Sequence, residues 1–213
     1  MSSELNFVQV YLLSRAGIAF LQCALWYGVP VPPSQRVSRA VAPLNSKDKA
    51  YIAINSVTET LFLQHCIAFI ATLDSFSSVF TTALASCAGA VLLTLGDDFL
   101  YSAFHYSLHK APFPLYKAVH YHHHGNTDPS RGYLDAVNEA PIEMGFALLI
   151  TAFVMEALRR LLTPAAVILF VTMRAIFAII NHLGRDTVLC GGLYDSRRHT
   201  LHHKLKYVHY GQL

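Results

Sequence analysis

The stretch from Val79 to His109, VFTTALASCAGAVLLTLGDDFLYSAFHYSLH, decides how the rest of the chain is interpreted. Its first part, Val79 to Phe104, is an apolar run close to the roughly 20 residues that a helix needs to cross a bilayer. The run ends in His105 and His109, which are four residues apart and therefore lie on one face of a helix. The stretch predicts a membrane helix whose last turns present two metal ligands together.

The composition of the whole chain agrees with a membrane protein. Of its 213 residues, 54% are hydrophobic and only 14% are charged, and the mean hydropathy is +0.38. An ordinary soluble domain is less apolar and carries more charge. The net charge of +3 comes from Lys and Arg scattered through polar loops, so nucleic-acid binding is not expected. Because neither a linker nor a repeat divides the chain, residues 1–213 are expected to form a single membrane domain.

Apolar runs predict an all-α integral membrane helical bundle with a histidine-rich metal-binding cap. Residues 7–104 hold the membrane helices and residues 105–213 the histidine-rich region. The expected spans are Phe7–Tyr27, Tyr51–Leu73 and Val79–Phe104. Two shorter runs, 142–158 and 164–180, predict a helical hairpin at 142–180 that either spans the membrane or is re-entrant. The four cysteines, none in a CxxC pair, are expected to be free and buried.

Loop charges predict the orientation. The loop from Pro30 to Lys49 contains four basic residues, whereas the turn from Asp74 to Ser78 contains none. Positive loops stay in the cytoplasm, so the first loop is expected there and the second turn in the lumen. All the histidine clusters are then cytoplasmic. The N-terminal segment lacks a basic region and a cleavage site, so it is expected to remain as an anchor. Arg159 and Arg160, at the hairpin tip, depart from the charge pattern.

Histidine clustering is the main functional signal. All of the 12 histidines except His65 lie at or beyond His105. They form an HxxxH pair at 105 and 109, an HxHHH run from His120 to His124, and an HxxHH group from His199 to His203. His182 and His209 stand alone.

The number of candidate ligands favours two metal ions. Imidazole binds zinc, copper, iron and nickel, so histidine alone does not identify the metal. A tetrahedral zinc ion takes about four ligands, and the chain offers more than twice that number. We predict two adjacent ions, bound by nine histidines that are also the catalytic residues: His105, His109, His120, His123, His124, His182, His199, His202 and His203.

Several other polar residues have two interpretations. His122 and His209 are either ligands or loop residues, and His65 is expected to be a core histidine. The polar residues Asp97, Asp98, Asn138, Glu139, Glu143 and Asp195 are either partners of the imidazoles or helix caps and interface residues. Of these, Asp98 and Asp195 are preferred as the carboxylates that orient the ligands.

The ordered motifs resemble a known family. The segment from Asp98 to His109, then Pro112, Leu115-Tyr116 and His120-x-x-His123-His124, is similar to the fatty acid hydroxylase and sterol desaturase superfamily. The similarity continues through residues 138–143, 181–182 and 195–203 to Tyr210-Gly211. It covers roughly residues 98–211, and the ordered trio HxxxH, HxxHH, HxxHH is specific.

The resemblance implies a function in lipid metabolism. It implies a membrane-bound non-haem di-iron oxidoreductase with two irons per chain, which uses O2 to hydroxylate or desaturate a lipid, sterol or terpenoid. It also implies that electrons come from NAD(P)H through a b-type haem protein as donor partner, that membrane lipids surround the protein, and that the location is the endoplasmic reticulum.

The chain departs from the family pattern at three places. Ala140-Pro141 replaces the usual His-Pro pair, Tyr106 follows His105 where a basic residue is common, and a Trp- and Asp-containing tail does not follow Tyr210-Gly211. The alternative prediction is therefore a catalytically degenerate member that acts as a binding or regulatory membrane scaffold. A histidine-rich transporter is ranked last, because transporters bind their substrates near the membrane midplane.

Overall fold

The computed structural model describes residues 6–28, 43–73, 79–125, 127, 129–189 and 192–211. In this part of the chain the long helices are α1 (Phe7–Gly28), α2 (Ser46–Ile70), α3 (Val79–Lys110), α6 (Pro141–Leu158) and α7 (Pro164–Asn181). The short elements are α4 (Phe113–Val119), η2 (His123–Gly125), α5 (Tyr133–Ala136), η3 (Arg159–Leu161), β1 (Val188–Leu189), β2 (Tyr194–Asp195) and α8 (Ser196–Leu205). The predicted all-α helical bundle is confirmed.

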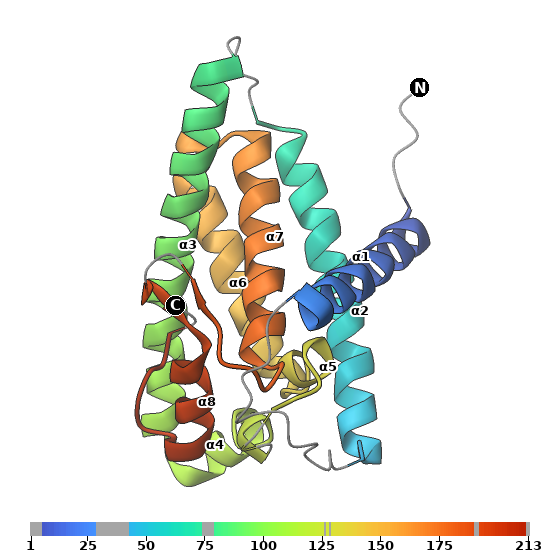
Figure 1. Ribbon diagram of the computed structural model, residues 1–213, viewed down its shortest axis with the longest axis vertical. Helices are drawn as coiled ribbons and strands as arrows, with labels where there is room; N and C mark the ends of the chain where they lie inside the picture. Colours follow the sequence, from blue (N-terminus) through green and yellow to red (C-terminus); the bar gives the residue numbers. More distant parts are fainter. Residues whose placement is uncertain are drawn as a thin grey trace.

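The long helices α2, α3, α6 and α7 run side by side along the long axis of the molecule, and α1 crosses them obliquely (Figure 1). The short elements α4, α5 and α8 gather at one end of this bundle. Because HxxxH ends α3 and HxxHH lies on α8, the histidine clusters meet at that end.

Among the described residues, four helices are long and apolar enough to cross a membrane: Phe7–Gly28, Ala83–Lys110, Pro141–Leu161 and Pro164–Asn181. Both arms of the predicted hairpin thus have the length of full spans. The predicted span Tyr51–Leu73 is not among the four. The helix there, α2, contains buried polar residues, including Asp48, Asn55 and Thr60, which lower its mean hydropathy, although it also exposes apolar side chains such as Leu61 and Ile67. The expectation that residues 1–213 form one domain stays a prediction.

The centre of the bundle is a small apolar core contributed by α2, α3, α6 and α7, with Leu93 and Met155 fully buried. Glycine allows the closest approach. A Cβ placed on Gly89 of α3 would lie 2.9 Å from the Cβ of Ala166 on α7. Membrane helices pack through such small residues because lipid tails supply no hydrophobic drive for their association.

The hairpin tip and the cysteines refine two expectations. Arg159 pairs with Glu156 at 2.8 Å and donates to the Thr72 hydroxyl at 2.7 Å, so the tip charge is bound to neighbouring polar groups. Cys66 is buried as expected, but Cys23 and Cys87 are exposed, which corrects that expectation. Both lie on the outer surface of apolar helices, where lipid tails replace water. Cys190 is outside the described residues. So are residues 29–42 and 74–78, whose charges were used to predict the orientation in the membrane.

Candidate metal centre

Five histidines converge on one point at the end of the bundle. Each offers one nitrogen, and these five atoms all lie within 4.8 Å of one another. They come from four separate elements of the chain: His105 and His109 from α3, His120 after α4, His124 from η2 and His202 from α8. We call these the first group.

Four further histidines form the second group by the same criterion: His123, His182, His199 and His203. The two groups adjoin. The ring centroids of His124 in the first group and His203 in the second are 5.1 Å apart, and those of His124 and His123 are 5.8 Å apart. The structure therefore brings together all nine histidines that the sequence predicted as ligands.

Local sequence explains how the ligands are presented. Pro112 precedes the first turn of α4, and His120 is the residue that ends this helix. From this position the ring of His120 reaches α3, where its Nε2 lies close to those of His105 and His109. Asp195 begins α8 by accepting a hydrogen bond from the Arg197 backbone N–H, so that His199 and His203 fall on one helical face, four residues apart.

Hydrogen bonds at Nδ1 determine which ring nitrogen is free. The Nδ1 of His105 lies 2.9 Å from the Tyr210 carbonyl, that of His202 lies 2.7 Å from the Val208 carbonyl, and that of His182 lies 2.8 Å from the Ala178 carbonyl. A carbonyl oxygen only accepts, so each Nδ1 must carry the hydrogen. The three Nε2 atoms are left as bare lone pairs, which is the form that binds a metal.

Glu143 does the same for His120. Its Oε1 lies 2.5 Å from the Nδ1 of His120, and both side chains are completely buried. A carboxylate that accepts from a ligand histidine fixes the ring and makes it more basic. The second oxygen, Oε2, has no hydrogen-bond partner among the described residues.

The spacing of the Nε2 atoms fits a bound cation. In the first group the Nε2 of His120 lies 2.9 Å from that of His105 and 3.0 Å from that of His109, and the remaining close approaches are 3.1 and 3.2 Å. With metal–nitrogen bonds of about 2.1 Å, ligands at right angles are about 3.0 Å apart, whereas tetrahedral ligands are about 3.4 Å apart. Bare lone pairs at this distance repel each other, and a cation between them removes the repulsion. The donor set fits an ion with more than four ligands.

Electrostatics keep the rings in the binding form. Burial lowers the pKa of His120, His124 and His199 well below the usual range, and the neighbouring imidazoles add to the effect. These rings are therefore neutral near pH 7, and the metal need not displace a proton from them.

The two preferred carboxylates, Asp98 and Asp195, lie at different places around the histidine groups. Asp195 caps α8 and forms an ion pair with Arg197 at 2.6 Å, the helix-cap interpretation. Asp98 lies against Gly211, because its carboxylate oxygens would be about 3 Å from a Cβ placed there. Gly211 follows Tyr210, whose carbonyl binds the Nδ1 of His105, so Asp98 packs against the segment that holds this ring. The carboxylate in contact with a ligand is Glu143, which the sequence pattern did not distinguish from its neighbours.

The remaining histidines are outside both groups. The Nε2 of His122 lies 3.0 Å from Asn138 Oδ1 and 3.2 Å from Asp48 Oδ1, which joins α2 to the segment before α6. His209 is exposed, and His65 is exposed on α2, which corrects the expectation that it is a core residue. Ala140 is buried at the start of α6.

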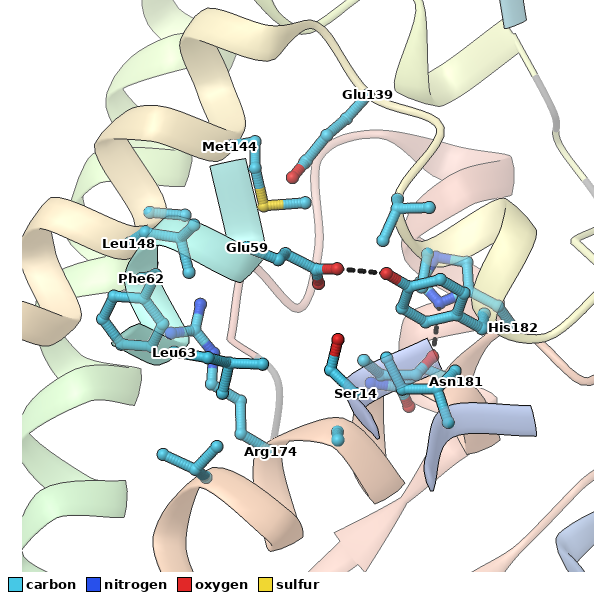
Figure 2. Close-up of a pocket in the computed structure, with 18 of the residues that line it drawn as sticks. Ser14, Glu59, Phe62, Leu63, Glu139, Met144, Leu148, Arg174, Asn181 and His182 are labelled. Atoms are coloured by element: carbon cyan, nitrogen blue, oxygen red, sulfur yellow. Dashed lines mark hydrogen bonds between the residues drawn. The ribbon is translucent and has the colours of Figure 1, made fainter. Parts of the chain in front are cut away.

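A cavity of about 290 Å³ leads from the metal centre into the bundle. Residues of both groups line it, including His105, His123 and His199. Its walls are apolar side chains of α1, α2, α6 and α7, such as Phe62, Leu63 and Leu148 (Figure 2). A lipid-like molecule in this cavity has access to the histidines.

Comparison with known proteins assigns the family. The family model for fatty acid hydroxylase matches residues 90–213, which is more than half of the chain and includes all nine histidines. The chain belongs to the fatty acid hydroxylase family. Neither a curated protein nor a solved structure matches it significantly.

Membership of the fatty acid hydroxylase family confirms the resemblance that the histidine motifs carry. Proteins of this family are hydroxylases and desaturases, oxidoreductases that act on lipids and typically depend on iron. The two histidine groups are able to bind metal, and the apolar helices agree with a membrane protein. The chain thus combines a histidine-rich metal site with a family whose chemistry is lipid oxidation.

Proposed function

We propose that the chain is a membrane-bound non-haem di-iron oxidoreductase that uses O2 to hydroxylate or desaturate a lipid, sterol or terpenoid. The observation that carries the proposal is the pair of adjacent histidine groups, in which ring Nε2 atoms lie 2.9 to 3.2 Å from one another. Four of these rings, His105, His120, His182 and His202, are tethered at Nδ1, which leaves their Nε2 atoms bare. The first group would hold one iron and the second group the other. When bound, the iron pair supplies the oxidising power for an unactivated C–H bond, which side chains lack.

The protein's own residues bind, orient and exclude water. The backbone carbonyls of Tyr210 and Val208 hold two ligand rings, and Glu143 holds a third. The apolar cavity walls keep bulk water away from the reacting carbon and admit substrate from the membrane side. Hydroxylation and desaturation begin with the same removal of a hydrogen atom from the substrate. The position in which the cavity holds the substrate therefore decides between the two outcomes.

We also propose that the histidine end faces the cytoplasm of the endoplasmic reticulum membrane and receives electrons from NAD(P)H through a b-type haem protein. Exposed basic residues at this end of the bundle support that orientation: Lys110 at the end of α3, Lys117 on α4, and Arg198 and Lys204 on α8. They also form a surface suited to an acidic protein partner.

Metal analysis tests the proposal. Iron content is measured by mass spectrometry on protein purified in detergent, for the wild type, His120→Ala from the first group, His203→Ala from the second group and the double variant. His122→Ala, outside both groups, is the matched control. We expect two irons per chain in the wild type and the control, one in each single variant and none in the double variant. Well-folded wild type without iron would contradict the proposal and favour the degenerate-scaffold alternative.

A further inference from the structure

The cavity beside the metal centre has polar groups as well as apolar walls, and most of them are bound to each other. Arg15 of α1 pairs with Glu59 of α2 at 3.2 Å. Tyr133 donates its hydroxyl to the same Glu59 carboxylate and accepts from Arg15. The opposite charges of Arg15 and Glu59 cancel. The polar groups of Arg15, Glu59 and Tyr133 are hydrogen-bonded to one another.

Arg174 of α7 also lines the cavity, and polar side chains of α6 and α3 hold it in place. It donates to the Thr151 hydroxyl, which in turn donates to Asp97 at 2.6 Å, and its guanidinium lies 3.7 Å from that carboxylate. Asp97 therefore offsets the charge of Arg174. Arg174 lines the cavity and Asp97 lies outside its lining, so the two charges of the wall's arginines are balanced by Glu59 within the wall and by Asp97 next to it.

Glu139 differs from these residues. It lies just before α6, and only 6% of its surface is exposed. Asn55 donates to the backbone carbonyls of Val137 and Glu139 at 2.8 and 2.9 Å, which holds this segment in place. Among the residues that the structure describes, no hydrogen bond to the Glu139 carboxyl is found, and Figure 2 shows the side chain directed into the cavity near Met144.

A buried carboxyl without a partner is costly unless a ligand completes it. Burial raises the pKa of Glu139 to about 8, against the opposing effect of the Arg174 guanidinium and with the help of Glu59. At neutral pH the carboxyl is therefore mostly protonated, and a protonated carboxyl donates a hydrogen bond. Such a donor in an electrically balanced cavity suits a neutral acceptor oxygen better than a carboxylate.

We propose that Glu139 is a positioning residue that donates a hydrogen bond to an oxygen of the substrate, and that the substrate is a neutral, mainly apolar molecule with a carbonyl, hydroxyl or ester group. This inference rests on the proposed function, because it assigns the substrate class of the same site. The hydrogen bond fixes how far the substrate extends along the cavity and hence which carbon lies next to the histidine groups. Glu139 acts on the bound molecule and not on the metal.

The cavity's size selects a probe. A flexible ten-carbon chain is a suitable probe for an apolar cavity of about 290 Å³. The ketone 2-decanone has an oxygen that only accepts, decane lacks the oxygen, and decanoate carries a charge. Together they separate the hydrogen bond from apolar packing and from ionic attraction.

The experiment measures equilibrium binding of radiolabelled 2-decanone and decane to full-length protein in phosphatidylcholine nanodiscs, with empty discs subtracted. The variants are Glu139→Leu, Glu139→Gln and, as the matched control, Glu156→Gln at an exposed position of α6. Competition with unlabelled decanoate and 2-decanone is compared at equal mole fraction in the disc. Iron content and melting temperature are recorded on every sample.

We expect Glu139→Leu to weaken 2-decanone binding about tenfold, the usual size of one buried hydrogen bond, without weakening decane. Glu139→Gln, whose amide still donates, should stay within about twofold of the wild type, as should Glu156→Gln. Decanoate should displace labelled 2-decanone at least tenfold less well than unlabelled 2-decanone does. Equal losses for 2-decanone and decane in Glu139→Leu, or failure of Gln to restore binding, would overturn the role of Glu139.

Displacement by decanoate as strong as by 2-decanone would overturn the neutral substrate class. These outcomes are distinguishable from failure of the proposed function. An iron-free wild type removes the oxidoreductase proposal and leaves the binding result standing. An iron-loaded wild type that does not distinguish 2-decanone from decane through Glu139 removes only the present inference.

Discussion

Replacing Glu143 with glutamine should weaken the first histidine group selectively. Glu143 and His120 are both fully buried, and the 2.5 Å contact joins the carboxylate to the ring's Nδ1. Glutamine has nearly the same size and keeps one oxygen that can accept from the Nδ1 of His120, so the packing of α6 is kept. The change removes the charge and turns one carboxylate oxygen into an amide NH2.

The expected magnitude follows from the contact. A hydrogen bond to a charged group contributes about 1.5–3 kcal/mol, which corresponds to roughly 10- to 150-fold in an equilibrium constant. Outer partners of metal-bound histidines change metal affinity by about 10- to 100-fold, in agreement. The second group contains no partner of Glu143, so its iron should be retained.

The assay is chelator competition followed by iron analysis in nanodiscs, with Glu156→Gln as the control for a neutralised carboxylate elsewhere on α6. One of the two irons should be lost at a roughly 10- to 100-fold lower chelator concentration in Glu143→Gln. The reasoning is refuted by a titration identical to that of the wild type, or by equal weakening of both irons in a protein with unchanged melting temperature.

Three further predictions concern the scaffold. Asp195→Ala removes the cap of α8 and should destabilise that helix by about 1 kcal/mol. Because α8 carries His202 of the first group and His199 and His203 of the second, chelator competition should show earlier loss of both irons, while Arg198→Ala, also on α8, should leave the titration unchanged. Gly89→Ala adds a Cβ that meets Ala166 at 2.9 Å, so overpacking of about 1–3 kcal/mol should lower the melting temperature in detergent, whereas Gly17→Ala, with open space around it, should not. Metal-free protein should lose stability as the pH falls below about 6.5, the ordinary histidine pKa. Burial lowers the pKa of rings such as His120 and His199 in the folded protein, so below that pH the unfolded chain binds more protons than the folded one. A melting temperature that stays constant from pH 7.5 to 5.5 would contradict this.

Helical spacing made the ligands predictable from sequence. Residues three or four apart share a helical face whatever the rest of the fold does, so His105 and His109 were expected to act together. The HxxHH motif at 199–203 was expected to act as one cluster, and the structure divides it between the two groups. Apolar run length likewise predicted α1, α3 and both arms of the α6–α7 hairpin. These properties depend only on local backbone geometry and on the thickness of a bilayer.

Contacts between distant segments were decided by the tertiary structure. The division of the nine histidines into groups of five and four depends on where α4, η2 and α8 dock against α3. The partner of His120 depends on the α6 helix direction, which places Glu143 against the ring while Asp195 remains at a helix end. Sequence spacing carries no information on such docking, because several carboxylates were equally near the motifs in the chain.

The sequence alone thus determined the helical class, the membrane character and the identity of the nine candidate ligands, since each follows from periodicity, run length or residue type. Only the folded chain showed that Asn55 and Thr60 of α2 are buried, that His122 binds Asp48 and Asn138 instead of joining a group, and that the Glu139 carboxyl, without a hydrogen-bond partner among the described residues, extends into the cavity. Burial and partnership are properties of a side chain's surroundings, and those surroundings come from elements far apart in the sequence.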